Sequence, residues 1–575
     1  MLDNRAEEEK MRRTVVAATL LASCLSVAAL VASSSGGAQA TAAALSPELV
    51  GTAAAFDKTP PLSQMKPVKP SGLPELDEEE DGAALVQTPH ETDGALQTQA
   101  PTGVMPAPLL TFEGPSNEDN FRIFGGRVNP PDPNGDVGPR HFVAMTNLTF
   151  AVYSKTGRVL LGPIDTGTLW QGFPIDDCTE PSGDPVVLYD EISDRWILTQ
   201  FTTRGLDIRN LPFYNCIAVS QTPDPTGAYF RYAFKTEGKN FPDYPKYGVM
   251  PDGLFVTTRE FEHSTAGGNE ILGIYAINRR QLVAGNPNTQ FVRFDLNQPA
   301  YHVGDGILPA DLDGSRLPPA GSPEYFVGSM DDDAGDHAPF DALNVFQANV
   351  DWSNPAAATF AFEKSVPIAE YDTIFPCAPT ARDCLPQPGI TDPAQFLDIL
   401  SYRERPLWRL QYRNFGTRET LVTNQSVEAR PGVAGVRWWE LRNPRNAALH
   451  QEGTWAPNDG INRWMGSVAL DKQGNLAVGY SVVNATNVFP GIRYAGRMNG
   501  DPLGQLTQAE AVLQNGSGVQ TTTNSRWGDY TSMSVDPKDG CTFWYMNEYY
   551  ARSGTAADPR PWQTRIGAFK FPGCA

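Results

Sequence analysis

The stretch RWGDYTSMSVDPKDGCTFWYMNEYY, from Arg526 to Tyr550, contains the pattern that decides the fold. It begins with Arg-Trp, continues as alternating apolar and polar residues to an Asp, turns at a Gly, and ends in a second apolar run. Two alternating runs around a Gly turn are typical of a β-hairpin. RWMGSVALDKQGNLAVGYS, from Arg463 to Ser481, has the same order. A hairpin that recurs in this way predicts a repeated structural unit.

The hairpin pattern occurs seven times after residue 108. The other five copies are Asn134–Asn147, Ser182–Phe201, Pro242–Phe261, Leu308–Asp331 and Trp408–Val427. Their irregular spacing indicates long, variable connections between units. Such a chain favours an all-β fold with a single β-propeller of six or seven four-stranded blades, because a closed ring covers the apolar faces and edges of its blades. Two adjacent β-sandwiches are the alternative.

Strand-like segments occur at both ends of the repeated region. Leu109–Gly114 reads LLTFEG, and the C-terminus reads TRIGAFKFPGC. The last blade of a propeller often combines strands from both ends of the chain, so these two segments are candidates to close the ring. We therefore predict a propeller domain over residues 109–575.

The N-terminus has the composition of an export signal. After the acidic leader, residues 11–40 read as a basic start, an apolar run and a final Ala-Gln-Ala. This order predicts a signal peptide over residues 1–40, with Met11 as the alternative start, and hence a secreted or periplasmic protein. A lipoprotein anchored at Cys24 is the alternative. Residues 41–108 are rich in Ala, Pro, Thr and acidic residues, which predicts a disordered spacer.

The net charge and the cysteines restrict the partners and the compartment. A formal net charge of −21 argues against nucleic acid or an anionic membrane surface as a partner. We expect a monomer with no transmembrane span in the mature chain. Six of the seven cysteines follow the signal, and an even number in an exported chain predicts disulfides. Pairing between neighbours along the chain gives Cys178–Cys216, Cys377–Cys384 and Cys541–Cys574.

The segment SVDPKDGCTFW resembles the Asp-box of bacterial sialidase-type (BNR) propellers, Ser-x-Asp-x-Gly-x-Thr-x-Trp. Ser534, Asp536, Gly540, Thr542 and Trp544 match, with two extra residues before the Gly. In that family the box is a structural turn at a blade edge, so the resemblance implies the fold rather than an activity.

A second segment, FRIFGG, resembles the Arg-Ile-Pro motif at the propeller entry of sialidases, in which the Arg holds the substrate carboxylate. The resemblance implies a substrate-binding role for Arg122, although Phe124 stands where the motif has Pro. Otherwise we interpret this segment as a strand entering the first blade. Three further stretches, PPDPNGDVGPRHFV, SGDPVVLYD and RWGDYTSMSVDP, resemble a group of exported bacterial propeller proteins with no settled activity.

Aspartates and arginines are the candidates for chemistry. The sequence lacks G-x-S-x-G, H-E-x-x-H, P-loop and G-x-G-x-x-G motifs, and its six histidines are scattered singly. Three aspartates, each after a Gly and directly before a predicted strand, are candidate catalytic residues: Asp136, Asp184 and Asp529. Four residues are candidates for substrate binding: Asp243 before another strand, Arg463 and Arg526 at equivalent repeat positions, and Arg122.

If the predicted strands are the innermost strands of their blades, these side chains converge in the central funnel. Paired carboxylates serve as acid and base or nucleophile in glycoside hydrolysis, and Arg binds acidic sugars. The alternative is that the aspartates cap tight turns by accepting nearby backbone N–H groups.

Two acidic loops have oxygen ligands at spacings that suit Ca²⁺. DPNGD contains Asp132, Asn134 and Asp136, and DDDAGD contains Asp331, Asp332, Asp333 and Asp336. Neither continues as a complete EF-hand loop, and solvated acidic loops are the alternative. Calcium is therefore a hypothesis at Asp132, Asn134, Asp331 and Asp333.

The sequence thus predicts an exported propeller that acts on an extracellular glycan, as a sialidase-like hydrolase or a lyase. The alternative is a non-catalytic adhesion module that binds a glycan or a protein. A propeller fold accommodates both classes, so the sequence leaves open whether the chain is an enzyme.

Overall fold

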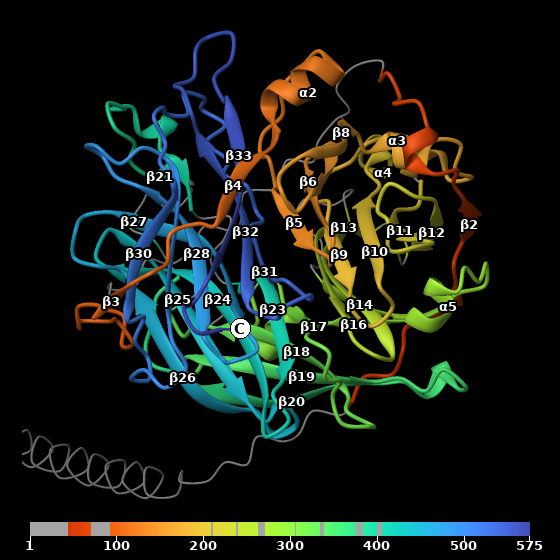
Figure 1. Ribbon diagram of the computed structural model, residues 1–575. Helices are drawn as coiled ribbons and strands as arrows, with labels where there is room; N and C mark the ends of the chain where they lie inside the picture. Colours follow the sequence, from red (N-terminus) through yellow and green to blue (C-terminus); the bar gives the residue numbers. More distant parts are fainter. Residues whose placement is uncertain are drawn as a thin grey trace, which may run out of the picture. The chain divides into compact units, whose positions relative to one another are not determined.

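Each of the seven predicted hairpins forms the first two strands of one antiparallel blade (Figure 1). The computed structural model describes residues 44–70, 92–208, 211–236, 238, 240–262, 271–304, 306–333, 338–373, 375, 383–399 and 405–574. Within these residues the chain forms seven blades of four strands, which confirms the predicted propeller and excludes two separate sandwiches. The predicted signal peptide, Cys24 and Cys377 lie outside the described residues.

In blades one to six the four strands follow one another in sequence from the axis outward, and in blade seven the outermost strand comes from the start of the ring. Blade one contains β5 (Asn134–Val137), β6 (His141–Thr146), β7 (Thr149–Ser154) and β8 (Val159–Asp165). Blade two contains β9 (Val187–Asp190), β10 (Arg195–Phe201), β11 (Tyr214–Ser220) and β12 (Tyr229–Lys235). Blade three contains β13 (Asn240–Val249), β14 (Gly253–Glu262), β15 (Ile271–Asn278) and β16 (Gln290–Leu296).

Blades four and five contain β17 (Leu308–Asp313), β18 (Glu324–Met330), β19 (Ala342–Asn349) and β20 (Thr359–Pro367), then β23 (Leu407–Asn414), β24 (Glu419–Arg430), β25 (Val433–Arg442) and β26 (Ala448–Trp455). Blades six and seven contain β27 (Asn462–Leu470), β28 (Leu476–Val483), β29 (Gly491–Arg497) and β30 (Gln508–Gln514), then β31 (Ser532–Val535), β32 (Thr542–Tyr550), β33 (Trp562–Lys570) and β4 (Leu110–Ser116).

Short elements lie between blades, between strands of one blade and before the ring. The helices are α2 (Asn117–Phe124), α3 (Gly167–Trp170), α4 (Arg204–Asp207), α5 (Arg279–Val283) and α6 (Gln298–Tyr301). The 3-10 turns are Leu62–Gln64, Asp176–Thr179, Pro355–Ala357, Pro393–Gln395 and Pro444–Asn446, and β21 (Asp383–Leu385) pairs with β22 (Leu397–Asp398). No helix in the described part of the chain is long and apolar enough to span a membrane.

The ring is closed by strands from both ends of the chain. β4 pairs antiparallel with β33 in the last blade, as the sequence predicts. The first strand of the last blade, β31, contacts β5 of the first blade. β17 and β23 pair in parallel, which shows that neighbouring inner strands run in the same direction. The starts of the inner strands therefore gather at one end of the axis.

Apolar side chains fill the spaces between blades. At the seam between blades seven and one, Trp544 packs on Phe142 with ring centroids 5.5 Å apart, and Met546 and Ile566 belong to the same buried cluster. Each buried aromatic removes a large apolar area from water, so this packing stabilises the closed ring.

Two of the three predicted disulfides are confirmed. Cys178 is bonded to Cys216 in blade two, and Cys541 is bonded to Cys574 in blade seven. A crosslink that closes a loop of this size contributes about 3–4 kcal/mol on the loop-entropy model. The Cys377–Cys384 pair stays a prediction.

The turn between β31 and β32 contains the segment that resembles an Asp-box. Asp536 accepts a hydrogen bond from the backbone N–H of Lys538 at 2.9 Å, and Gly540 has a φ of 64°. Lys155 of blade one donates to Asp536 at 2.6 Å. The segment therefore stabilises a tight turn and the seam between two blades.

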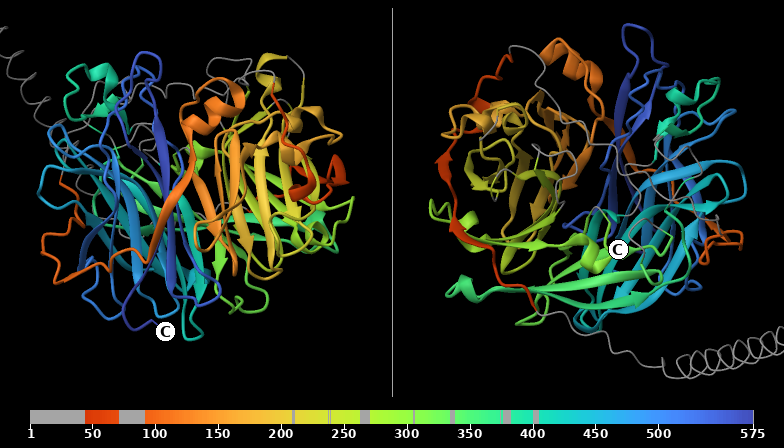
Figure 2. Two further views of the ribbon diagram at one scale, coloured as in Figure 1. Left: turned by 45° about the horizontal axis from the view of Figure 1, so that its top comes forward. Right: turned by 180° about the vertical axis from the view of Figure 1, so that it is seen from behind.

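The predicted spacer differs from the structure over two segments. Residues 44–70 and 92–104, here called the N-terminal belt, run along the outer edges of the blades (Figure 2). β1 (Leu49–Thr52) extends blade three, β2 (Ala55–Lys58) extends blade two, and β3 (Gly103–Val104) extends blade six. Residues 71–91 lie outside the described residues. The composition of the belt is misleading because its contacts are mainly main-chain hydrogen bonds to exposed sheet edges.

One buried and one partly buried ion pair attach the belt to the ring. Asp93 accepts a hydrogen bond from Arg437 at 2.8 Å and one from the Thr454 hydroxyl at 2.7 Å. Arg231 donates from Nε to Asp57 at 2.7 Å. These arginines hold acidic residues of the belt against the blades. The same acidic residues contributed to the prediction of a disordered spacer.

Arg122 lies on a helix rather than on a strand. Ser116 and Asp119 form a capping box at the start of α2, and Gly125 ends the helix with a φ of 74°. The Arg122 side chain is 59% exposed and pairs with Asp119. The prediction of a strand is therefore wrong, because local capping selects a helix, and the substrate-binding role of Arg122 stays a prediction.

Candidate functional site

Side chains from blades that are not neighbours meet at one end of the axis. The hydroxyl of Tyr530, in blade seven, donates to Asp184, just before blade two, at 2.9 Å. The same hydroxyl lies 3.1 Å from the carbonyl oxygen of Pro245 in blade three. Groups from these three blades approach one another only at the centre of the ring. We call this group the upper cluster and define it by seven residues, all buried: Asp132, Asp184, Asp243, Lys246, Arg526, Asp529 and Tyr530.

Backbone turns before the inner strands aim these side chains at the axis. Asp132, Asp184 and Tyr244 have φ values of 43°, 53° and 50°, and they lie at similar places in three successive blades. Residues other than glycine adopt this left-handed region at a cost of about 1–2 kcal/mol, and Asp tolerates it better than most. Strained residues of this kind gather at functional sites in many proteins.

Hydrogen bonds connect the upper cluster across blades seven, one and two. Arg526 donates from Nη2 to both oxygens of Asp529, at 2.8 and 2.7 Å. The backbone N–H of Asp529 donates to Asp132 at 2.7 Å. Asn147 donates to the other oxygen of Asp132 and accepts the N–H of Asp184 at 3.0 Å. Asp132 thus accepts a backbone N–H, as the turn-capping alternative predicts, whereas the side chains of Asp184 and Asp529 accept from Tyr530 and Arg526.

Lys246 lies between two aromatic rings. Its Nζ is 2.9 Å from the ring centroid of Tyr244 and 3.9 Å from that of Tyr530. The guanidinium of Arg405 also lies over the Tyr244 ring, and the distance from Arg405 Cζ to the ring centroid is 3.7 Å. Lys246 forms no salt bridge with any described residue, and its Nζ donates to the carbonyl oxygen of Tyr244 at 3.3 Å. Cation–π contacts therefore hold this ammonium beside several carboxyl groups.

Burial shifts the protonation of the upper cluster. Desolvation, and then the charge of Asp529, raises the pKa of Asp132 to about 8, against the opposing effect of Arg526. Desolvation, with further contributions from Asp132 and Asp243, raises the pKa of Asp184 well above its usual value. Desolvation also lowers the pKa of Lys246 well below its usual value. Asp132 and Asp184 therefore retain protons near neutral pH.

A second charged group lies further along the inner strands. We call it the lower cluster and define it by Asp136, Asp311, Asp313, Arg409 and Gln411. Arg409 donates to Asp311 and, at 2.5 Å, to Asp313. Asp136 accepts the backbone N–H of Tyr189 at 2.7 Å, and desolvation, opposed by Arg409, raises the pKa of Asp136 to about 7.

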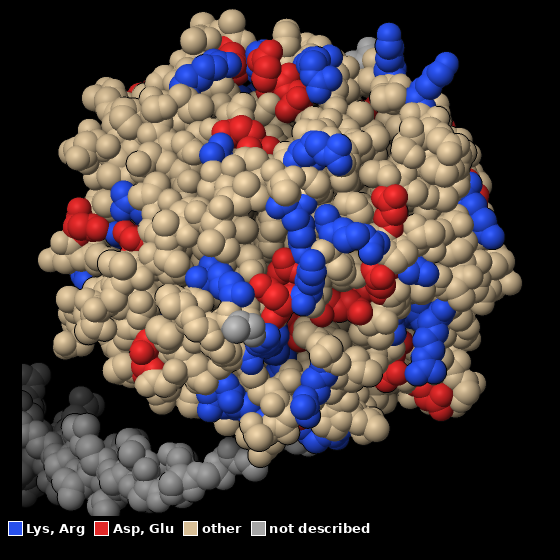
Figure 3. Space-filling model, in the orientation of Figure 1, with Lys and Arg blue, Asp and Glu red and all other residues tan. Residues whose placement is uncertain are grey.

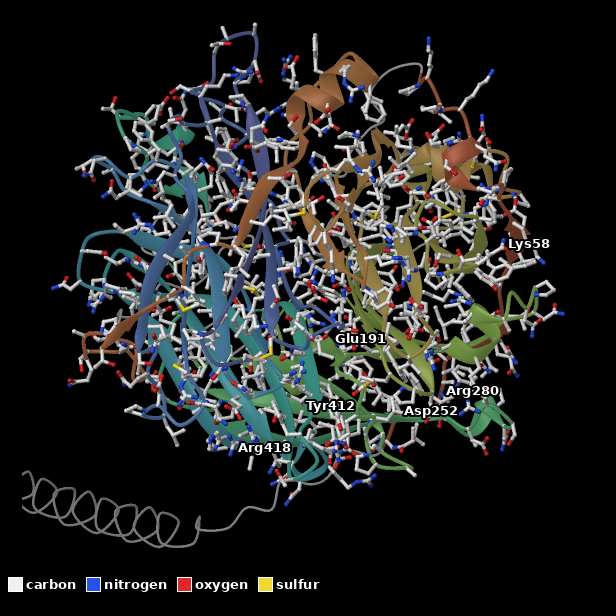
Figure 4. The ribbon with its side chains drawn as sticks, viewed as in Figure 1. Lys58, Glu191, Asp252, Arg280, Tyr412 and Arg418 are labelled. Atoms are coloured by element: carbon white, nitrogen blue, oxygen red, sulfur yellow. A yellow bond between two sulfur atoms is a disulfide. The ribbon has the colours of Figure 1, made fainter. Side chains whose placement is uncertain are left out.

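The lower cluster faces the end of the axis seen in Figure 3, where acidic and basic side chains gather around the centre of the face. Glu191, labelled in Figure 4, lies at this centre and accepts the N–H of Gly314 at 3.0 Å. Desolvation, with a contribution from Asp313, raises the pKa of Glu191 to about 8.

The structure therefore separates the predicted catalytic residues. Asp184 and Asp529 meet in the upper cluster with Asp243 and Arg526, whereas Asp136 belongs to the lower cluster. The predicted convergence of Asp136 with the other two aspartates is wrong, because Asp136 lies further along the inner strand, where it accepts the backbone N–H of Tyr189 beside Arg409 and Asp311.

Arg463 is turned into its own blade. It donates from Nε to Glu510 at 2.6 Å and from Nη1 to Asp459 at 3.0 Å, and it is fully buried. The prediction that Arg463 binds substrate in the funnel is wrong, because these two carboxylates hold the guanidinium between β27 and β30.

The two calcium hypotheses have different outcomes. In DPNGD, Asp132 belongs to the upper cluster, whereas Asn134 accepts the N–H of Val187 at 2.9 Å, so these residues do not form one ligand set. In the second loop, carboxylate oxygens of Asp331, Asp332 and Asp341 lie within 4.8 Å of one another, and so do those of Asp332, Asp333 and Glu370. Calcium at Asp331 and Asp333 stays a prediction.

Sequence reasoning missed Lys246, Tyr244 and Tyr530 as members of the site. Lys246 lies on β13, where the register shifts between Asp243 and Lys246. A β-bulge of this kind changes which side chains face the axis, and alternation of residue types does not reveal it. The available signal was the cluster of ionisable and aromatic residues in PDYPKYG, from Pro242 to Gly248.

No protein-family model matches the chain, and a search of curated proteins gives no match. Among solved structures, an α-L-arabinofuranosidase from Fusarium graminearum shares 11% identity at a TM-score of 0.29, over 58% of this chain and 94% of that protein. An α-L-arabinanase from Penicillium chrysogenum shares 9% identity at a TM-score of 0.30, over 57% of this chain and 93% of that protein. An endo-arabinase from Bacteroides thetaiotaomicron shares 12% identity at a TM-score of 0.26, over 55% of this chain and 93% of that protein. At these values the matches carry no argument about activity, and they do not indicate the sialidase type.

Proposed function

We propose that the upper cluster hydrolyses a glycosidic bond in an extracellular glycan. The observation that carries this proposal is the meeting of a proton-retaining carboxyl, Asp184, with a carboxylate bound by Arg526, Asp529, at one end of the propeller axis. Glycoside hydrolases use one carboxylic acid and one carboxylate on the two sides of the scissile bond. Two such groups with different environments are the usual basis of this division of roles.

Each residue has a defined task in this proposal. Asp184 donates its proton to the glycosidic oxygen as the bond to the anomeric carbon breaks. Asp529 remains ionised because two charge-assisted hydrogen bonds from Arg526 stabilise the anion, and it activates the attacking water or attacks the anomeric carbon itself. Tyr530 fixes the orientation of Asp184 through its hydroxyl. Lys246 provides positive charge beside both carboxyl groups.

The arrangement does not favour an acidic sugar. A sialidase-type site needs arginines that hold the substrate carboxylate, whereas Arg122 and Arg463 lie elsewhere in the fold. Arg526 directs two hydrogen bonds at Asp529, and its Nε lies 3.6 Å from a carboxylate oxygen of Asp398. We therefore propose a glycan that is neutral at the cleaved residue.

A non-catalytic glycan-binding module is the second candidate. The observation in its favour is that one backbone N–H and the Asn147 amide already bind Asp132, and that Asp184 accepts the Tyr530 hydroxyl. Carboxyl groups used in this way lock neighbouring blades together, and binding would then depend on the loops around the axis.

The deciding experiment compares the wild-type protein with Asp184→Asn on a panel of neutral and acidic polysaccharides, with released reducing ends as the readout. Asn has the shape of a neutral Asp, so we expect the melting temperature to change little. Loss of a general acid lowers turnover by about 10²–10⁴-fold. Unchanged turnover in Asp184→Asn contradicts the proposal, and binding without release of reducing ends by the wild-type protein supports the second candidate.

A further inference from the structure

A groove of about 580 Å³ lies between blades three and four. It is lined by the β13–β14 turn, by the loop 317–323 that precedes β18, and by residues that follow β19. The residues that line the groove include none of the upper cluster, so the two sites are separate. In Figure 4, the labelled side chains of Asp252 and Arg280 mark its rim.

Glu324, at the start of β18, faces this groove. The ring of Tyr325 stacks on that of Tyr412 in blade five, with centroids 6.3 Å apart. The ring of Phe326 meets that of Phe255, a groove residue in blade three, with centroids 6.0 Å apart. Successive side chains of a strand point to opposite faces, so Glu324 lies on the Phe326 side, toward blade three.

The Glu324 carboxyl is buried without compensation. Glu324 is 3% exposed, and neither of its oxygens has a hydrogen-bond partner among the described residues. Desolvation raises its pKa well above the usual value and Asp311 reinforces the shift; the backbone N–H of Ala310 approaches the carboxyl and opposes the shift, but its geometry is not that of a hydrogen bond. A buried polar group without a partner is costly, so a ligand that bonds to this carboxyl gains free energy that solvent does not supply.

The charges around the groove specify the complementary ligand. Two exposed carboxylates, Asp252 and Asp351, and one exposed guanidinium, Arg280, line the rim, and Glu324 adds a third carboxyl at depth. Apolar side chains, including Met250, Phe255 and Val350, form much of the wall. Acidic groups thus outnumber basic ones around an apolar lining, which favours a cation with an apolar stem.

We propose that this groove binds a small molecule with a primary ammonium on an aliphatic stem, and that Glu324 is its counter-ion. The ammonium has three donors for the carboxylate and nearby carbonyl oxygens, and the stem lies on the apolar wall. On binding, the Glu324 carboxyl releases its proton to solvent and becomes the anion that pairs with the ammonium. The site is independent of the proposed hydrolase activity.

The test is isothermal titration of the full chain with n-pentylamine at neutral pH, with pentan-1-ol as the uncharged probe of equal stem length. We expect the amine to bind at least tenfold more tightly than the alcohol. Glu324→Gln should weaken amine binding at least tenfold. Asp351→Asn, at the exposed rim, should have a smaller effect because water screens its charge.

Two controls separate a local site from general effects. Glu363→Gln removes an exposed carboxylate from β20 of the same blade, outside the groove residues, and should leave the affinity unchanged. The melting temperature of Glu324→Gln should equal or exceed that of the wild-type protein, because a neutral amide replaces a buried, uncompensated acid. Equal affinity of amine and alcohol, undiminished amine binding by Glu324→Gln, or no amine binding by the wild-type protein would each overturn the proposal.

Discussion

The upper and lower clusters lie on the same axis but use their cations differently. In the lower cluster, Arg409 donates directly to two carboxylates, Asp311 and Asp313. In the upper cluster, Lys246 is held between two tyrosine rings and forms no salt bridge with a described residue. Arg409 therefore forms direct ion pairs with two carboxylates, whereas Lys246 only opposes, through space, the raised pKa that desolvation gives Asp184.

This difference separates a structural role from a chemical one. A forked guanidinium with two carboxylates fixes the relative position of blades four and five, which contribute Asp311, Asp313 and Arg409. A proton-retaining carboxyl beside an ionised one is suited to acid–base chemistry. We therefore assign stability to the lower cluster and reactivity to the upper cluster.

The largest expected effect is that of Arg409→Met. This change leaves Asp311 and Asp313 buried without their shared cation, and breaking a buried ion pair in this way costs about 3–5 kcal/mol. We expect the free energy of unfolding, measured with urea, to fall by this amount. Arg122→Met, which breaks the exposed pair with Asp119, should change it by less than about 1 kcal/mol. Similar values for the two variants would contradict a structural role for the lower cluster.

The second effect is a pH dependence that originates in the upper cluster. The folded-state pKa of Asp132 is raised to about 8, so its contribution to stability is complete below its unfolded-state pKa and is lost as the pH rises through about 8. Each titrating proton changes the free energy of unfolding by about 1.4 kcal/mol per pH unit. Between pH 5 and 7, Asp132→Asn should therefore show a shallower decline in stability than the wild-type protein. Parallel curves in urea titrations would exclude a protonated Asp132.

The third effect is that of Lys246→Met, the counterpart of Arg409→Met in the upper cluster. Lys246 has a lowered pKa, its contacts among the described residues are with tyrosine rings and a carbonyl oxygen rather than a carboxylate, and Met has a similar length. We expect the free energy of unfolding to change by less than about 1 kcal/mol. Turnover should fall, because the positive charge beside Asp184 and Asp529 is removed. A loss of stability as large as that of Arg409→Met would remove the distinction between the clusters.

Much of this architecture could be predicted from the sequence because it follows from repetition. The hairpin pattern located the two inner strands of every blade, and the Asp near the start of each inner strand located Asp184, Asp243 and Asp529 in one cluster. Repetition also indicated the closing pair of β4 and β33. These features depend on local residue order, which the sequence displays directly.

The remaining features depend on contacts that local patterns do not display. The N-terminal belt adds strands to sheet edges through backbone groups, so its composition resembles that of a disordered segment. Lys246 faces the axis because of a bulge. Arg463 faces away from it because Glu510, on another strand, holds it. The helix that contains Arg122 had a visible signal, the Ser116 and Asp119 capping box.

The smallest expected effect is that of Asp136→Asn on turnover. Asp136 accepts backbone N–H groups in the lower cluster, and an Asn oxygen can accept one of these bonds. We expect turnover to remain within about twofold of wild type on any glycan that the protein cleaves, with only a modest loss of stability. A large loss of turnover without unfolding would place Asp136 in the reaction and merge the two clusters into one site.

The most direct test of the account is the protonation state of Asp184 beside Asp529 at neutral pH. Infrared difference spectra of the wild-type protein against Asp184→Asn report whether the removed group was a carboxylic acid or a carboxylate, and Asp529→Asn gives the matched comparison. The account predicts that Asp184→Asn removes a protonated carboxyl band and that Asp529→Asn removes a carboxylate band. Loss of a carboxylate band in both variants would contradict the assignment of an acid and a base to the upper cluster.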